Sequence, residues 1–272
     1  MASYEVRRWL TPLEISQIEY SEYWNDEEKE KAKEWWILDG DFGKMERHLE
    51  KTKLVQQLDE CITCLKYTLN RTLHGVGADL ASGNLWAVPY LLNAGQVDRI
   101  YCVEYSQHRL LKLGLEVLQH YNVPKDKVVL CLGSFYELKL PNQSLDFILL
   151  SQAFHHADRP HALLAEIRRV LKPQGLVLII GESSPPPSKL KMYVMHLVKV
   201  FISLLVPKSI QTAIFGRTFN VKTILAKKEY TPPDPILGDR CYSDDEYQAM
   251  FSYHGFLSHR TKLPRGFVLI SS

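Results

Sequence analysis

The sequence has no apolar run long enough to cross a bilayer. Its most apolar stretch, residues 192–206, is interrupted by His196, Lys199 and Ser203 and is shorter than the ~20 residues that a spanning helix needs. The first residues also lack the apolar core of a signal peptide. We therefore expect no transmembrane segment and a cytoplasmic location.

The sequence also lacks an excess of charge of one sign. Lys and Arg number 33 against 31 Asp and Glu, a formal net charge of +2. Nucleic-acid-binding proteins usually concentrate basic residues on one face. We therefore expect no nucleic-acid partner.

Cysteine is scarce and scattered. An odd set of five, Cys61, Cys64, Cys102, Cys131 and Cys241, does not suggest a disulfide framework. Cys61 and Cys64 have CxxC spacing, but no second pair follows at the spacing of zinc ligands. Two ordinary helix cysteines are favoured over a metal or redox pair, and we predict no metal site.

What the chain does have is an alternation of strand and helix patterns. Short runs rich in Val, Ile and Leu, typical of strands buried on both faces, alternate with helical patterns at residues 85–94, 108–121 and 160–171. The predicted strands are residues 75–80, 99–104, 127–132, 145–151 and 176–181, with two more at 256–263 and 266–271. This order predicts an α/β protein with a parallel sheet.

Four regions can be separated along the chain. Residues 1–74 are predicted to form a helical cap, with helices near 27–36 and 44–67, and residues 75–182 form the α/β core. Residues 183–242 are a helical insertion after the fifth strand, with a helix at 189–205. Residues 243–272 complete the core, and Ser243 with Glu246 predicts a capping box at the start of its helix.

Polar and small residues follow the predicted strands. Asp79, Ala81 and Gly83 come at the end of the first strand, where a tight turn allows a ligand to approach the backbone. Glu104 ends the second strand, and its carboxylate can accept two ribose hydroxyls. An ordinary turn and a solvated carboxylate are the alternatives. Because parallel strands bring their carboxyl ends to one edge of the sheet, we expect a ligand site there.

The order of DLASGN, CVEYS, GSFYELKLPNQSLDFILLSQAFHH and EIRRVLKPQGLVLIIGE resembles the class I S-adenosylmethionine-dependent methyltransferases. It is most similar to the subfamily that includes quinone-biosynthesis and other small-molecule enzymes. The resemblance covers about residues 75–182 and, more loosely, 240–272. It implies a doubly wound, seven-stranded, mostly parallel Rossmann-like sheet whose last strand is antiparallel. It also implies S-adenosyl-L-methionine as cofactor and a small-molecule methyl acceptor, with a lipophilic or aromatic one left open.

The resemblance also assigns residues to the cofactor. In chain order they are Asp79, Ala81, Gly83, Glu104, Tyr105, Gly133, Ser134, Phe135, Ser151 and Gln152. The first three would line the methionine moiety, Glu104 would hold the ribose beside Tyr105, and Ser134 and Phe135 would meet the adenine. Ser151 and Gln152 would lie beneath the sulfonium. The sequence departs from the family at Ala81 and Leu85, where glycines are usual, at Ser134, where Asp is frequent, and at Gln174, where Gly is frequent.

Catalytic candidates follow the fourth strand. Methyl transfer is an in-line displacement that needs alignment of the reactants, and it needs a base when the acceptor must lose a proton. His155 or His156 could be that base, and the alternative is that one of them packs against or caps the next helix. Glu182 either faces the acceptor or is solvated.

The parts outside the sheet would build the acceptor pocket. The helix at 189–205 is apolar nearly all round, as expected of a buried helix, a homodimer contact or a lid over a lipophilic acceptor. Aromatic residues of the first region could cover the cofactor or belong to a core. They are Tyr20, Tyr23, Trp24, Trp35 and Trp36.

Two other functions compete with the enzyme. A non-catalytic binding or regulatory protein could keep the fold while its glycine-poor loop loses cofactor affinity. A nicotinamide-dependent oxidoreductase is disfavoured because no G-x-G-x-x-G follows the first strand.

Overall fold

The computed structural model describes residues 3–18, 24–26, 41–182, 189–215, 240–261 and 266–272. The predicted helix at 27–36 and the aromatic residues Tyr20, Tyr23, Trp35 and Trp36 lie outside these ranges. The described part divides into two compact units. Unit 1 is formed by residues 1–184 and 236–272, and unit 2 by residues 185–235.

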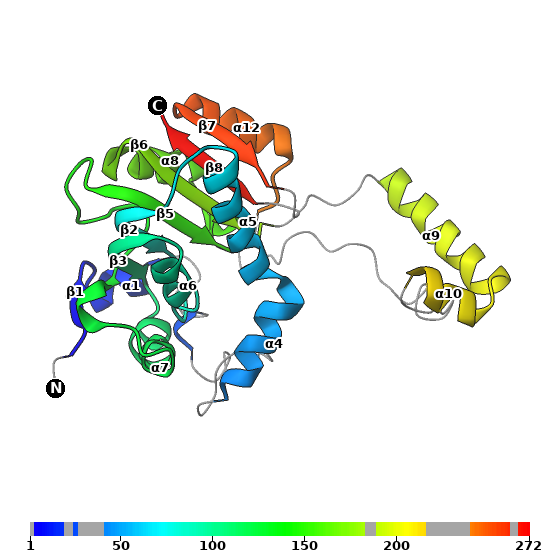
Figure 1. Ribbon diagram of the computed structural model, residues 1–272, viewed down its shortest axis with the longest axis horizontal. Helices are drawn as coiled ribbons and strands as arrows, with labels where there is room; N and C mark the ends of the chain where they lie inside the picture. Colours follow the sequence, from blue (N-terminus) through cyan, green and yellow to red (C-terminus); the bar gives the residue numbers. More distant parts are fainter. Residues whose placement is uncertain (1–2, 19–23, 27–40, 183–188, 216–239, 262–265) are drawn as a thin grey trace. The chain divides into compact units, whose positions relative to one another are not determined.

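Unit 1 is built on one sheet whose strands run in the order β1-β4-β3-β2-β5-β6-β8-β7 (Figure 1). The strands are β1 (Glu5–Arg8), β2 (His74–Leu80), β3 (Gln96–Glu104), β4 (Val128–Leu132), β5 (Leu145–Ser151), β6 (Leu171–Ile180), β7 (Phe256–Arg260) and β8 (Phe267–Ser271). Strand β8 pairs antiparallel with both of its neighbours, and the other pairs are parallel. The α/β class and the mostly parallel sheet are confirmed.

Among the described residues the sheet has eight strands, where seven were predicted. The extra strand is β1, which pairs in parallel with β4 at the edge of the sheet. The prediction that residues 1–74 are helical was therefore wrong at β1. An edge strand has only one hydrogen-bonded neighbour, and this one has three of its four residues exposed. It consequently lacks the apolar run by which the buried strands were found.

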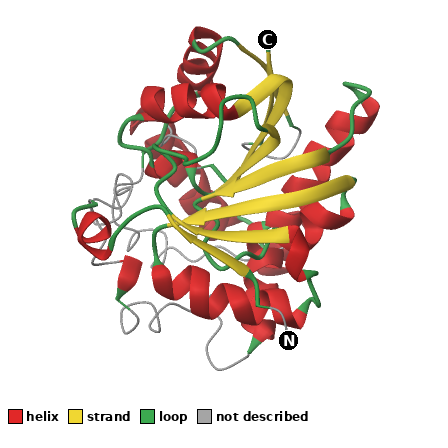
Figure 2. Cartoon of the chain, turned by 90° about the vertical axis from the view of Figure 1, so that its left-hand side faces the viewer, coloured by secondary structure: helices red, strands yellow, loops and turns green. Residues whose placement is uncertain are grey.

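The helices cover both faces of the sheet (Figure 2). Alternate strand residues feed two separate cores: Cys102 and Leu149 belong to one, and Val103 and Leu150 to the other. The helical segments of unit 1 are α1 (Pro12–Ser16), α4 (Phe42–Thr52), α5 (Leu54–Tyr67), α6 (Val88–Asn93), the π-helical η1 (Arg109–Leu113), α7 (Gly114–His120), the 3-10 turns η2 (Lys125–Lys127) and η3 (Phe154–His156), α8 (Pro160–Val170) and α12 (Asp244–Tyr253). This two-sided cover is what a doubly wound sheet requires.

Two helix predictions need comment. The helix expected at 44–67 is divided into α4 and α5 by Lys53, whose φ of 58° is left-handed. The capping box of α12 is confirmed, because Ser243 Oγ accepts from the Glu246 amide and the Glu246 carboxylate accepts from the Ser243 amide.

Unit 2 contains two described helices, α9 (Lys189–Leu205) and α10 (Lys208–Phe215). The buried amide of Gln211 in α10 donates to the carbonyls of Ile202 (3.1 Å) and Val206 (2.6 Å), so the two helices are joined by a capped turn. Among the helices that the structure describes, none is long and apolar enough to span a membrane.

Candidate cofactor and acceptor site

A cavity opens where the strand order reverses. Successive strands β2, β3 and β4 proceed toward one edge, whereas β5 lies on the other side of β2. Such a reversal separates the loops that follow the two neighbouring strands, and open α/β sheets bind ligands there. In this chain the cavity has a volume of about 620 Å³.

Most of the predicted site residues line this cavity. They are Ala81, Gly83, Glu104, Tyr105, Ser134, Phe135, Ser151, Gln152, His155 and His156. Asp79 and Gly133 do not line it. Asp79 is still within β2 and is 2% exposed, and a Cβ on Gly133 would lie 2.7 Å from the Trp9 ring.

The turn after β2 has an unusual backbone. Ala81, Gly83 and Leu85 have φ values of 54°, 53° and 65°, in the left-handed region that glycine adopts most easily. A Cβ on Gly83 would meet no atom within 4 Å, so this residue leaves open space on the cavity side. Ala81 and Leu85 therefore keep the turn geometry although they replace the glycines usual in the family.

Glu104 holds this turn in place. Its carboxylate accepts hydrogen bonds from the amides of Gly83 (3.0 Å) and Ser106 (2.8 Å) while it lines the cavity. Burial, and then the charge of Glu104, raise the pKa of the neighbouring Asp79 to about 8. Asp79 therefore keeps its proton below about pH 8, and Glu104 is the carboxyl group of this turn that faces the cavity.

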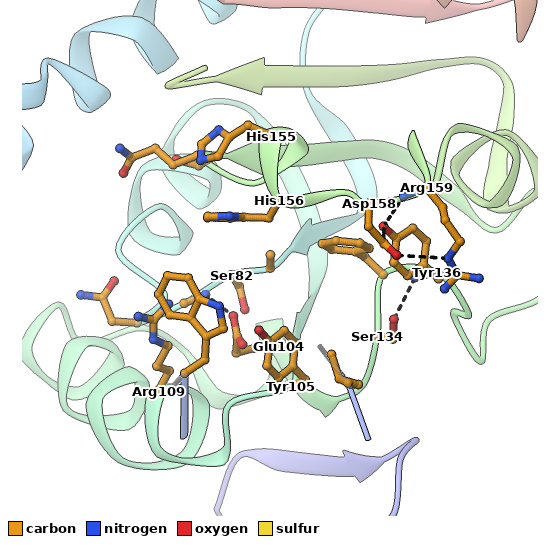
Figure 3. Close-up of a pocket in the computed structure, with 18 of the residues that line it drawn as sticks. Ser82, Glu104, Tyr105, Arg109, Ser134, Tyr136, His155, His156, Asp158 and Arg159 are labelled. Carbon is orange, nitrogen blue, oxygen red and sulfur yellow. Dashed lines mark hydrogen bonds and ion pairs between the residues drawn. The ribbon is translucent and has the colours of Figure 1, made fainter. Parts of the chain in front are cut away.

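The loop after β4 brings an aromatic pair to the cavity, and Figure 3 labels Tyr136 of this pair. The rings of Phe135 and Tyr136 meet edge to face at 4.6 Å, and the Tyr136 amide donates to Ser134 Oγ. The Tyr136 hydroxyl donates to Asp158, and the Arg159 guanidinium lies 4.4 Å from the ring centre. Asp158 and Arg159 thus hold the Tyr136 side chain in place, and together with Phe135 it forms one wall of the cavity.

Trp24 contributes a second wall from the first region of the chain. It is 9% exposed and lines the cavity. The Arg109 guanidinium lies 4.1 Å from its ring centre, and the His156 ring meets it edge to face at 5.4 Å. Of the first-region aromatic residues expected to cover the site, Trp24 is the described one.

His155 belongs to a buried polar chain. Its Nδ1 lies 3.3 Å from Glu182 Oε2, and the side chain of Glu182 is fully buried. The same carboxylate accepts from the Tyr247 hydroxyl (2.7 Å) and, through Oε1, from the Phe154 amide (3.2 Å). Glu182 is therefore a buried partner of His155 and not a solvated loop residue.

Several lining residues were not predicted. Trp86, Arg109, Tyr136, Asp158, Arg159 and Arg240 come from helices and loops beyond the strand ends. Tyr136 could have been predicted, because it directly follows the predicted Ser134 and Phe135. The other five residues follow no sequence spacing that would predict them.

Comparisons with known proteins agree with this arrangement. Residues 78–179 match the protein family described as "Methyltransferase domain". An uncharacterized methyltransferase of Schizosaccharomyces pombe is 36% identical over 78 residues. That match covers 28% of this chain and 28% of the relative, so the chain spans little more than a quarter of its length. The crystal structure of the YcgJ protein from Bacillus subtilis superposes with a TM-score of 0.50 at 20% identity, over 75% of this chain and 69% of that one; it shows the shared fold.

Residues 78–179 thus match a methyltransferase domain, and the cofactor that this match implies is S-adenosylmethionine. The residues present fit it. Gly83 leaves the space that a closely approaching ligand needs. The buried hydroxyl oxygens of Ser82 and Ser151, both on the cavity, have no hydrogen-bond partner among the described residues. Buried hydroxyls are usually paired, so these two are suited to contact a polar ligand.

Two further predictions concern metals and thiols. All five cysteines are free thiols. No group of three or more His, Cys, Asp or Glu side chains that could hold a metal occurs among the described residues. Cys61, the first residue of the CxxC pair, lies on α5 and is buried in the core that also contains Cys102 and Leu149. This burial raises the pKa of its thiol.

Proposed function

We propose that this chain is an S-adenosylmethionine-dependent methyltransferase that acts on a small acceptor. The observation that carries the proposal is the cavity at the strand reversal, where Glu104 and the left-handed turn at Gly83 meet the walls formed by Trp24 and Phe135. The quinone-biosynthesis-like subfamily, the cytoplasmic location and a homodimer remain proposals with it.

The residues that would hold the cofactor are those of the strand ends. Glu104 would accept the ribose hydroxyls, Ser134 and Phe135 would meet the adenine, and Gly83 with Ser151 would lie along the amino-acid end. Bound there, the cofactor supplies an electrophilic methyl group on a sulfonium. The Glu104 carboxylate on the cavity wall favours that positive charge.

His155 is proposed to take the acceptor's proton. If its Nδ1 hydrogen is donated to the buried Glu182 carboxylate, Nε2 is the basic nitrogen of the ring. Tyr247 and the Phe154 amide hold Glu182 in place, so Glu182 and Tyr247 are positioning residues. His156 is proposed to pack against Trp24. This division favours an acceptor that loses a proton on methylation, such as a hydroxyl group.

The lining also bears on the kind of acceptor. Besides aromatic rings it contains Arg109, Arg159 and Arg240 together with the carboxyl groups of Glu14, Glu104 and Asp158. Such a mixed wall favours a small aromatic acceptor with polar groups over a purely aliphatic one.

The non-catalytic alternative rested on the glycine-poor loop. Because Ala81 and Leu85 adopt left-handed backbone conformations, the loop keeps the shape that glycines would give it. This supports the enzyme over the alternative.

Transfer of labelled methyl from S-adenosylmethionine to a panel of small phenols, alcohols and amines tests the proposal. We expect His155→Asn to lower kcat/KM by about 100-fold or more, as removal of a general base does, while cofactor binding is kept. Glu182→Gln should move the acidic limb of the pH–rate profile to lower pH, because the imidazolium loses its charged partner. His161→Asn on α8, away from the cavity, is the matched control. Unchanged activity in His155→Asn would exclude it as the base.

A further inference from the structure

Helix α9 exposes an apolar stripe. Six large apolar side chains of this helix are between 49% and 68% exposed: Val194, Leu197, Val198, Phe201, Leu204 and Leu205. Successive members are three, one, three, three and one residues apart, which places them on one face of the helix. Single exposed apolar residues are ordinary on protein surfaces, but a contiguous stripe marks an interaction surface.

The segment around the stripe is strongly basic. Residues 183–228 contain eight Lys and Arg and no Asp or Glu. Since the whole chain has 33 basic and 31 acidic residues, the remainder has 25 basic and 31 acidic, a net charge of −6. The positive charge of this protein is therefore gathered in the segment that carries the apolar stripe, including Lys191 and Lys199 on α9 itself.

An apolar helix face within a basic segment is the pattern of helices that lie in the interface of an anionic membrane. Such helices place apolar side chains among the acyl chains and lysines at the headgroups. The helix does not cross the bilayer, which agrees with the described helices being too short or too polar to span one.

A second copy of the chain fits the stripe less well. A two-fold dimer through this face would bring the same surface against itself. Lys199 would then meet a segment that has basic residues and no carboxylate. The phosphates of anionic lipids supply the missing negative charge.

We propose that unit 2 binds the surface of an anionic bilayer through the α9 stripe, with its lysines at the headgroups. This peripheral membrane contact is independent of the methyl-transfer proposal. The stripe provides the inserted surface, and the excess of Lys and Arg provides the preference for anionic lipid.

The test is flotation of the full chain with vesicles of phosphatidylcholine alone or mixed with phosphatidylglycerol. We expect binding to the mixed vesicles that weakens as salt rises, and little binding to phosphatidylcholine alone. Leu204→Asp should lower the partition coefficient about tenfold or more, since a charge replaces an inserted apolar side chain. Leu257→Asp on β7 is the matched control, because Leu257 is 63% exposed against 68% for Leu204.

A charge variant tests the second half of the proposal. Lys199→Glu combined with Lys208→Glu should weaken binding to the mixed vesicles, whereas Lys139→Glu in unit 1 should not. Hydrogen exchange of residues 194–205 should slow only when mixed vesicles are present.

Three results would overturn the proposal. One is equal binding of the wild-type chain to both vesicle types, and another is unchanged binding of Leu204→Asp. The third is slow exchange of residues 194–205 without vesicles, which means that a second copy or unit 1 covers the stripe. Sedimentation of the wild type and Leu204→Asp then separates these two occupants.

Discussion

At the scale of single residues, the turn after β2 shows how a chain keeps a glycine-like geometry without glycine. Leu85 has a φ of 65° and is fully buried, and a Cβ on Gly114 of α7 would lie 2.7 Å from its Cδ1. A left-handed backbone costs about 1–2 kcal/mol, whereas a buried leucine contributes about 2–5 kcal/mol relative to alanine. Burial therefore outweighs the strain at this position.

This balance predicts a stability cycle. Leu85→Ala should lower the free energy of unfolding by about 3 kcal/mol because it opens a cavity. Gly114→Ala added to it should recover about 1 kcal/mol, since the new methyl fills part of the space and alanine favours the helix. Gly114→Ala alone should be destabilising because Leu85 occupies that space. Urea unfolding of the four proteins measures the cycle, and strictly additive effects would show that the two residues do not share a site.

Asp79 gives a pH prediction at the same scale. Its pKa is raised from 3.8 to about 8 in the folded chain, so between about pH 4 and pH 8 the folded state keeps a proton that the unfolded state releases. The free energy of unfolding should therefore fall as pH rises through this window. Asp79→Asn cannot ionise and should show a smaller fall. Urea midpoints across the window measure the difference, and parallel curves for the two proteins would contradict the raised pKa.

The residue scale also shows what a sequence can say about a site. Strand-end residues such as Glu104 and Ser134 could be predicted, because parallel strands gather their carboxyl ends at one edge. Arg109 and Arg240 could not, because they approach from a helix and a later loop. The link between His155 and Glu182 joins residues after two different strands, and only the fold reveals it.

At the scale of elements, buried strands were predictable and the edge strand was not. Strand β4 is a continuous apolar run and β5 contains the apolar run 147–150, and both lie close to where the sequence placed them. In contrast, β1 contains Glu5, Arg7 and Arg8 and gives no such signal. The division of α4 from α5 was missed because Lys53 is not a residue that marks a turn.

Helix α12 provides the prediction at this scale. Its capping box begins the helix that brings Tyr247 to Glu182. Ser243→Ala should lower the free energy of unfolding by about 1 kcal/mol, the usual contribution of an N-cap hydroxyl. Ser252→Ala, exposed near the other end of the same helix, should leave stability unchanged or raise it slightly. If both variants behave alike in urea unfolding, the cap does not stabilise the helix.

At the scale of the whole molecule, the two proposed functions fall on two different units. Unit 1 carries the sheet, the cavity and residues 78–179, which match the methyltransferase domain family. Unit 2 carries the apolar stripe and an excess of basic residues. The net charge of the whole chain does not reveal this separation. Its value of +2 is the sum of a basic segment and an acidic remainder.

Titration calorimetry with S-adenosylmethionine tests the central claim most directly. The account predicts that the wild-type chain binds one molecule and that Glu104→Gln weakens binding about 10- to 100-fold, because a charged hydrogen bond contributes about 1.5–3 kcal/mol. Glu137→Gln, exposed on the loop after β4, should bind as the wild type does. A wild-type chain that binds neither S-adenosylmethionine nor its demethylated product would contradict the account, as would a Glu104→Gln variant that binds with unchanged affinity.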